Sequence, residues 1–328
     1  MTSPAAARAG PLCTLTIATH ELAPLQLFFE EGHGLQFEGP LRIATATRRA
    51  RAALWNISED LGYEEYRFTR AGVRDAARIR VLVLDGNSEP WRGSWEPGVF
   101  GPYTIGFPNT VQQQLDTQLR ALGFGARNPL ERTLFQHQDG RSWEILESLA
   151  TAPEFVAAVG IARGADQPPI SPVNSMGLGG PAYSMCVVPD TDKMCVFMRD
   201  AFGYETRNRR RQRSAGRLGA MNTPDGTEFE IAQCYPPFGA HGFLIFLQFT
   251  NMEVVQPPHP PCLPATGLVM YSLPVDDIQA VLLRARTAGA TEISWPVAMA
   301  DPAYGNTLQA TLTAPCGIVF ELVQDTLA

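Results

Sequence analysis

Short apolar runs alternate with polar turns along the whole chain, and four of these runs lead directly into a helical pattern. The four runs span residues 12–19, 102–107, 183–188 and 268–273. Each is followed by a polar residue suited to begin a helix and, 12 to 14 residues later, by a glycine suited to end it in the left-handed conformation. These pairs are Glu21 with Gly34, Asn109 with Gly123, Asp190 with Gly203, and Asp277 with Gly289. We therefore predict four helices of about three turns, each entered from a strand.

The glycines that end these helices recur every 80 to 89 residues, which is typical of a duplicated unit. A second repeated pattern, Gly-x-x-x-Glu-aliphatic, begins at Gly140, Gly226 and Gly317. Its aromatic and aliphatic residues follow turn formers, which predicts turns that enter strands. The first unit has an apolar strand at residues 79–85 but lacks the Gly-x-x-x-Glu form. The remainder of each unit is patterned as short strands, so each unit has the order βαβββ.

Two proline-rich segments, residues 167–172 and 256–264, separate later units and are stiff spacers unsuited to central strands. The first divides the chain into an N-terminal half, residues 1–165, and a C-terminal half, residues 174–328. Each half holds two units. The predicted fold class is α+β, with four βαβββ modules that form two pseudo-symmetric, open, barrel-like halves.

Composition narrows the classes of partner. A hydrophobic share of 45% with 18% charged residues is typical of a globular protein with a substantial core. The net charge of −7 argues against nucleic acid as a partner. The longest apolar run, residues 242–249, is too short to cross a bilayer, so no membrane is expected. No secretory signal is visible, and the six cysteines are scattered without a Cys-x-x-Cys pair, so we expect reduced thiols in a cytoplasmic protein.

The fourth unit resembles the vicinal oxygen chelate superfamily, which contains glyoxalases, bleomycin-resistance proteins and extradiol dioxygenases. Residues 275–290 are similar to the helix of that family's module. Residues 314–324, which contain Gly-x-x-x-Glu-Leu-Val-Gln, are similar to its last strand. The third unit is the next best match and the first is the weakest. The resemblance implies that two modules pair around an open cleft, where His or Glu on the first strands and Glu on the last strands commonly hold a divalent metal.

Carried over residue by residue, the family's metal positions are only partly kept. The last-strand positions would be Glu144, Glu230 and Glu321. The first-strand positions hold no histidine; they are Thr14, Pro102, Tyr183 and Met270. Iron and zinc in such sites are normally held by imidazole together with carboxylate, so no firm metal site is predicted. Glu230 and Glu321 could still hold a hard divalent ion weakly, with waters completing the shell.

The candidate catalytic residues are Glu321, Glu230 and Tyr183. Glu321 stands among apolar residues, where a carboxylate either lines a cleft or is buried with a partner. Desolvation would raise its pKa into the range of a general base. Glu230 is expected at the equivalent place in the third unit, and Tyr183 would complete an acid/base set. The alternative is that these glutamates are hydrogen-bonded fold residues without a catalytic role.

Three further residues are candidates for substrate binding. Arg209 lies in the basic run at residues 207–213, which is either a solvated strand or a receptor for a carboxylate or phosphate. His241 precedes an apolar strand that could carry it into a cleft. Met270 occupies a first-strand position of the fourth unit.

The resemblance favours a cytoplasmic enzyme, a lyase or isomerase, that acts on a small oxygenated organic molecule by acid/base chemistry. The expected class of substrate includes aromatic molecules. Its cleft is expected in the C-terminal half with Glu321 as the base, because units three and four keep the fullest motifs. One alternative is an extradiol-type ring-cleaving dioxygenase, which the missing histidines disfavour. Another is a resistance-type protein that binds a small molecule without chemistry. The sequence leaves open whether the protein forms a homodimer.

Overall fold

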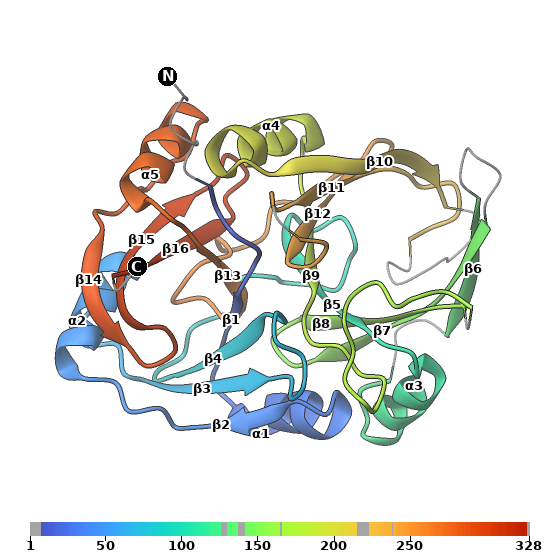
Figure 1. The fold of residues 1–328 in the computed structure, drawn as a ribbon, viewed down its shortest axis with the longest axis horizontal. Coiled ribbons are helices and arrows are strands. Elements are labelled where there is room, and N and C mark those ends of the chain that lie inside the picture. Colours follow the sequence, from blue (N-terminus) through green and yellow to red (C-terminus); the bar gives the residue numbers. More distant parts are fainter. Residues whose placement is uncertain are drawn as a thin grey trace.

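A computed structural model describes residues 8–125, 130–136, 142–164, 166–214, 223–237 and 239–326. It confirms the four-module α+β architecture, with two eight-stranded sheets that each curl into an open half-barrel (Figure 1). Gly140, which opens the repeated motif of the second module, lies outside these ranges. Within them, no helix is long and apolar enough to cross a membrane.

The first and fourth modules together form one sheet, named sheet I, in the strand order β14-β15-β16-β13-β1-β4-β3-β2. The elements of the first module are β1 (Thr14–Thr19), α1 (Leu22–Gln26), η1 (Leu27–Gly32), β2 (Gln36–Glu38), α2 (Thr45–Trp55), β3 (Tyr63–Thr69) and β4 (Arg78–Leu84). Those of the fourth are β13 (Gly267–Pro274), α5 (Ile278–Thr287), β14 (Val297–Asp301), β15 (Gly305–Thr313) and β16 (Val319–Asp325). Helix α2 is an addition to the predicted module pattern.

The second and third modules form sheet II, in the order β10-β11-β12-β9-β5-β8-β7-β6. The elements of the second module are β5 (Gly101–Pro108), α3 (Gln112–Ala121), β6 (Glu131–Gln136), β7 (Ser142–Ala152) and β8 (Val156–Arg163). Those of the third are β9 (Tyr183–Val187), α4 (Thr191–Phe202), β10 (Glu205–Arg213), β11 (Glu228–Tyr235) and β12 (Phe243–Phe249). Helices α3 and α4 lie outside the curl of the sheet, so its inner face is the one they leave uncovered (Figure 1).

The sheets do not follow the sequence division into residues 1–165 and 174–328. Strand β1 pairs antiparallel with β13, and β5 pairs antiparallel with β9, so each sheet takes one module from each sequence half. The two sheets touch through their outer faces, where the hydroxyls of Tyr271 on β13 and Ser184 on β9 are 2.7 Å apart. The inner face of each half-barrel is therefore built from both halves of the chain.

Two of the four predicted helix-start residues cap their helices, whereas the Glu21 side chain caps none and Asn109 lies two residues before the N-cap of α3. Asp190 and Asp277 accept hydrogen bonds from the backbone N–H groups of Lys193 and Ala280, which satisfies donors that a helix start leaves unpaired. Each of the four helix-ending glycines has a positive φ, between 66° and 99°, where a side chain would be strained: Gly34, Gly123, Gly203 and Gly289.

The repeated Gly-x-x-x-Glu motif does not mark the same strand in each module. It enters the last strand only in module four, at β16; in module three it enters β11, the strand before the last. The side chain of Gln324 on β16 accepts a hydrogen bond from the first backbone N–H of α5, and Gln248 on β12 does the same for α4. Gln248 on the last strand of module three is therefore the counterpart of Gln324. Any turn that enters a half-buried strand can produce this motif, so it cannot distinguish neighbouring strands.

Candidate functional site

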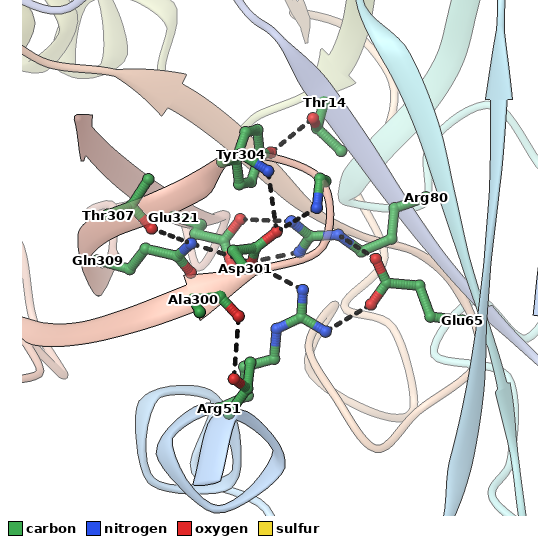
Figure 2. A network of polar contacts seen from close by, with 12 residues as sticks. Thr14, Arg51, Glu65, Arg80, Ala300, Asp301, Tyr304, Thr307, Gln309 and Glu321 are labelled. Atoms are coloured by element: carbon green, nitrogen blue, oxygen red, sulfur yellow. Dashed lines mark hydrogen bonds and ion pairs between the residues drawn. The ribbon is translucent and has the colours of Figure 1, made fainter. Parts of the chain in front are cut away.

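A chain of buried charges fills the inner face of sheet I. Helix α2 lies over this face and directs the Arg51 guanidinium to Glu65 on β3 and Asp301 on β14, at 2.5 and 2.7 Å. Arg80 on β4 lies beside them, 3.1 Å from Glu321 on β16 and 3.9 Å from Glu65 (Figure 2). All five side chains are buried. Because burying a charge is costly without a partner, the carboxylates and guanidiniums must occur together here.

Both carboxylate oxygens of Glu321 accept hydrogen bonds within this cluster. Its carboxylate accepts hydrogen bonds from Trp55 Nε1 at 3.1 Å, from both terminal nitrogens of Arg80 at 3.1 and 3.2 Å, and from Ser272 Oγ at 2.7 Å. A carboxylate has about four lone-pair sites, and these four hydrogen bonds occupy them. The structure thus places the predicted base in a fully buried position, where its oxygens already have partners.

The Asp301 carboxyl group is kept in its ionised form within this cluster. Burial opposes the charged form, but Arg51, Arg80 and a hydrogen bond from Gln309 lower the pKa of Asp301 to about 2. The same aspartate also accepts hydrogen bonds from the backbone of the turn at Ala303 and Tyr304. The cluster therefore joins α2, β3, β4, β14 and β16 through buried ion pairs, which hold the half-barrel closed.

Strand pairing identifies the counterparts of the family's metal-binding positions. Thr16 on β1 lies opposite Met270 on β13, and Thr14 lies opposite Ser272, so an approximate twofold axis relates the two strands. On the neighbouring parallel strands, Arg80 of β4 is aligned with Thr16 of β1, and Glu321 of β16 is aligned with Ser272 of β13. Arg80 thus occupies the position in module one that Glu321 occupies in module four, and the two form an ion pair instead of a pair of metal ligands.

In sheet II both corresponding positions are apolar. Val159 on β8 pairs beside Gly106, and Ile245 on β12 pairs beside Met185. Throughout the part of the chain that the structure describes, no group of three His, Cys, Asp or Glu side chains is placed to hold a metal ion.

The three predicted catalytic residues are not brought together. Glu321 belongs to sheet I, whereas Tyr183 lies on the inner face of sheet II. Glu230 is on β11 but faces the other way, towards α4, where it accepts hydrogen bonds from Thr191 and Arg209 at 2.7 and 2.8 Å. Despite partial desolvation, the hydrogen bonds from Thr191, Arg209 and Arg211 lower the pKa of Glu230.

The predicted substrate-binding residues are also dispersed. Arg209 is paired with Glu230 and Asp192 on the outer face of sheet II. Met270 is buried in the apolar part of sheet I. His241 is half-buried in the turn that leads into β12.

The inner face of sheet II differs sharply from that of sheet I because it is mainly apolar and aromatic. The rings of Tyr183 and Phe243 stack at 5.0 Å between centroids, and those of Phe243 and Tyr235 stack at 4.3 Å. Fully buried aliphatic side chains lie behind this aromatic ladder, while several apolar side chains around it are only partly buried: Trp95, Ile145, Tyr235 and Ile245. This face is therefore suited to contact a small organic molecule.

One carboxylate, Glu147, stands on this apolar face. It lies on β7 between Ile145 and Leu149, which point the same way because side chains alternate along a strand. Burial, with the charge of Glu131 directly opposite on β6, raises the pKa of Glu147 to about 7, although Arg210 partly offsets this. Among the described residues no group donates a hydrogen bond to its carboxylate. A carboxyl group with these properties can exchange a proton near neutral pH.

Glu147 and Tyr183 influence one another. Burial raises the pKa of Tyr183, and the nearby Glu147 carboxylate raises it further, so the phenol keeps its proton at neutral pH. Arg210 acts on Glu147 from β10, at the opposite edge of the sheet from β6, because the curl brings the two edges towards each other (Figure 1).

Glu147 was missed from the sequence, although the signal was present. The repeated motif pointed to Glu144, which faces the other way and pairs with Arg132 at 2.9 Å on the surface. Continuing the alternation past Ile145 places Glu147 and Leu149 on the buried face. The glutamate that interrupts that apolar face was the informative one.

The raised pKa of Glu147 predicts how stability depends on pH. The unfolded chain loses this proton near pH 4.5 and the folded chain near pH 7, so ionisation of Glu147 destabilises the fold as pH rises between these values. Glu147→Gln removes the penalty. After allowance for partial exposure we expect about 1 kcal/mol, or about 2 °C in Tm, gained by the variant at pH 8 but not at pH 4. Thermal unfolding of both proteins at both pH values measures this. A variant that loses stability selectively at pH 8 would show instead that the carboxylate is stabilising.

The fold is shared with solved structures across nearly the whole chain. Glyoxalase I from Zea mays superposes with a TM-score of 0.59 at 13% sequence identity, covering 96% of this chain and 92% of that one. A mutant of the same enzyme gives a TM-score of 0.61 at 14% identity. A putative dioxygenase from Bacillus subtilis subsp. subtilis str. 168 gives 0.58 at 12% identity, covering 97% of this chain and 86% of that one. No protein-family model and no curated protein matches the sequence.

These likenesses define the class of the fold. The chain shares its fold with glyoxalase I and with a putative dioxygenase over nearly its whole length, and the predicted four-module fold is confirmed. At such low identity the likeness carries the fold alone, and the chemistry has to be argued from the side chains of this chain.

Proposed function

We propose that this protein is a glyoxalase-like enzyme that moves a proton on a small oxygenated organic molecule at the inner face of sheet II, with Glu147 as the general base. The observation that carries the proposal is the setting of Glu147. It is a half-buried carboxylate on an apolar and aromatic face, without a hydrogen-bond donor in the described ranges, and its pKa is raised to about 7. Glu321, by contrast, has four hydrogen-bond donors.

The neighbouring groups suit proton abstraction beside a carbonyl or from a phenol. The ionised Glu147 carboxylate would take the proton, and the apolar wall would keep competing water away from it. Tyr183 keeps its phenolic proton and interacts with Glu147. Its hydroxyl would donate a hydrogen bond to the oxygen on which negative charge develops. The ladder of Tyr183, Phe243 and Tyr235 would form an aromatic wall beside the substrate.

A metal ion has no part in this proposal. The positions that correspond to the family's last-strand ligands hold Arg80 and Glu321 in sheet I, and Val159 and Ile245 in sheet II. A guanidinium and two aliphatic side chains do not bind divalent cations. The donor set of this chain therefore does not fit the family metal, and the proton steps are assigned to protein side chains.

Exchange of substrate protons with solvent tests the proposal directly. The protein is incubated in D₂O with a panel of α-hydroxycarbonyl compounds, phenols and aryl ketones, and deuterium uptake at carbon is followed by NMR and mass spectrometry. We expect exchange or isomerisation for at least one compound class, unaltered by Glu144→Gln, a change on the same strand but on its outer face. A compound that binds tightly yet is recovered without deuterium or rearrangement would favour a resistance-type binding protein.

A further inference from the structure

Two thiols meet between helix α4 and strand β11, on the outer face of sheet II and away from Glu147. The sulfur atoms of Cys195 and Cys234 are 3.7 Å apart, and the Cys234 thiol donates a hydrogen bond to Cys195. Cys195 is 8% exposed at the edge of this contact, and Cys234 is 1% exposed. A disulfide bond has a sulfur separation of about 2.05 Å, so each sulfur needs to move by less than about 1 Å to form one.

The two thiols differ in their readiness to react. The hydrogen bond from Cys234 is the main influence that lowers the pKa of Cys195, against burial; Thr206 and the charge of Arg209 on β10 also lower it, while Asp192 on α4 opposes them. The same sulfur contact, with burial, raises the pKa of Cys234, which therefore keeps its proton. Since a thiolate is the reactive nucleophile, Cys195 is the attacking sulfur and Cys234 the resolving one.

We infer that Cys195 and Cys234 form an oxidative modification site that reacts with hydrogen peroxide or an organic hydroperoxide and closes into an intramolecular disulfide. In the first step the Cys195 sulfur attacks the hydroperoxide, the O–O bond breaks, and the departing oxygen takes a proton to become water or an alcohol. Cys195, oxidised by two electrons, is then a sulfenic acid. In the second step the Cys234 sulfur loses its proton and displaces the hydroxyl of Cys195, which leaves as water. Two thiols and one hydroperoxide thus give one disulfide, one water or alcohol, and one water.

Another buried cysteine provides a matched comparison. Cys186 on β9 is fully buried and lies 3.3 Å from the Tyr271 hydroxyl, and burial raises its pKa. Among the described residues no thiol donates a hydrogen bond to Cys186, and the nearby Cys316 raises its pKa further, so Cys186 lacks the thiolate character of Cys195. Oxidation of Cys186 is expected to be slow under conditions that close the Cys195–Cys234 pair.

Mass spectrometry of the full-length protein tests the inference. Reduced protein is treated with hydrogen peroxide, denatured and alkylated with iodoacetamide. We expect a product lighter by two hydrogen atoms before alkylation, in which two of the six cysteines escape alkylation. Peptide mapping should link the peptides that contain Cys195 and Cys234, and dithiothreitol should restore full alkylation.

Variants separate this pair from general oxidation. In Cys234→Ser, the hydroxyl can still donate a hydrogen bond to Cys195 but cannot resolve a sulfenic acid, so we expect trapping by dimedone at Cys195 instead of a cross-link. Cys186→Ser should leave the cross-link unchanged. The inference is overturned if all six cysteines of the folded wild-type protein stay alkylatable after peroxide treatment. It is also overturned if another cysteine reacts first, or if the protected pair persists in Cys195→Ser. Because Cys195→Ser and Cys234→Ser alter different elements, failure of one to fold leaves the other as the test.

Discussion

Replacing Glu321 with alanine is expected to lower the free energy of unfolding by about 3–5 kcal/mol, the usual cost of removing one partner from a buried ion pair. The change leaves the Arg80 guanidinium buried at 2% side-chain exposure, without its closest ion-pair partner and with only the more distant Glu65 and Asp301 as counter-charges. It also strips the acceptor from Trp55 Nε1 and Ser272 Oγ. In a chain of this size the melting temperature should fall by about 10 °C.

Urea unfolding followed by circular dichroism measures this effect. The double variant Arg80→Met with Glu321→Leu should recover much of the loss, because it removes both charges and replaces them with apolar volume. Glu228→Ala, an exposed change on β11, serves as the control and should stay within about 0.5 kcal/mol of wild type. If Glu321→Ala kept wild-type stability but lost activity, Glu321 would be the base after all.

Replacing Glu147 with glutamine is expected to reduce kcat by about 10²–10⁴-fold, the usual contribution of a positioned general base, while KM changes little. Glutamine keeps the shape of the side chain on β7 but cannot accept a proton. Because the pKa of Glu147 is raised to about 7, wild-type kcat should increase as pH rises through neutrality, and the residual activity of the variant should lack that increase. The compound that shows deuterium exchange is the substrate for this measurement.

Two further variants make the assignment specific. Glu144→Gln, on the same strand but on the outer face, should leave kcat within a few-fold of wild type. Tyr183→Phe removes the hydroxyl beside Glu147 and keeps the ring stacked on Phe243, so it should lower kcat while the aromatic contact to substrate persists. Retention of full turnover by Glu147→Gln, with the fold intact, would exclude this carboxylate as the base.

The sequence was sufficient to predict the modules because their boundaries are set by local chemistry. Asp190 and Asp277 begin helices through bonds within a few residues, and Gly203 and Gly289 end them through a backbone conformation that glycine favours. The helix-ending glycines repeat in every module whatever the tertiary contacts are. The predicted four-module fold is confirmed for this reason.

The pairing of modules and the arrangement of the site depend on contacts between distant parts of the chain, so local sequence patterns could not predict them. Arg51 meets Asp301 across 250 residues, and Glu321 meets Trp55 across 266. No local pattern shows whether a carboxylate within an apolar strand, such as Glu321, will find a buried guanidinium or a substrate. The motif that pointed to Glu230 fell on the strand before the last, and so on the outer face, because its spacing is common to any turn that enters a strand.

The pairing of β1 with β13 also constrains the order in which the protein can fold during synthesis. Strand β1 leaves the ribosome first, but its antiparallel partner begins at Gly267, so sheet I waits for most of the chain to be translated. At about 5–20 residues per second this wait lasts more than ten seconds. The second and third modules are contiguous in sequence, so sheet II can close while the first module still exposes an unpaired strand edge. That exposed edge is the part of the nascent chain most in need of a chaperone.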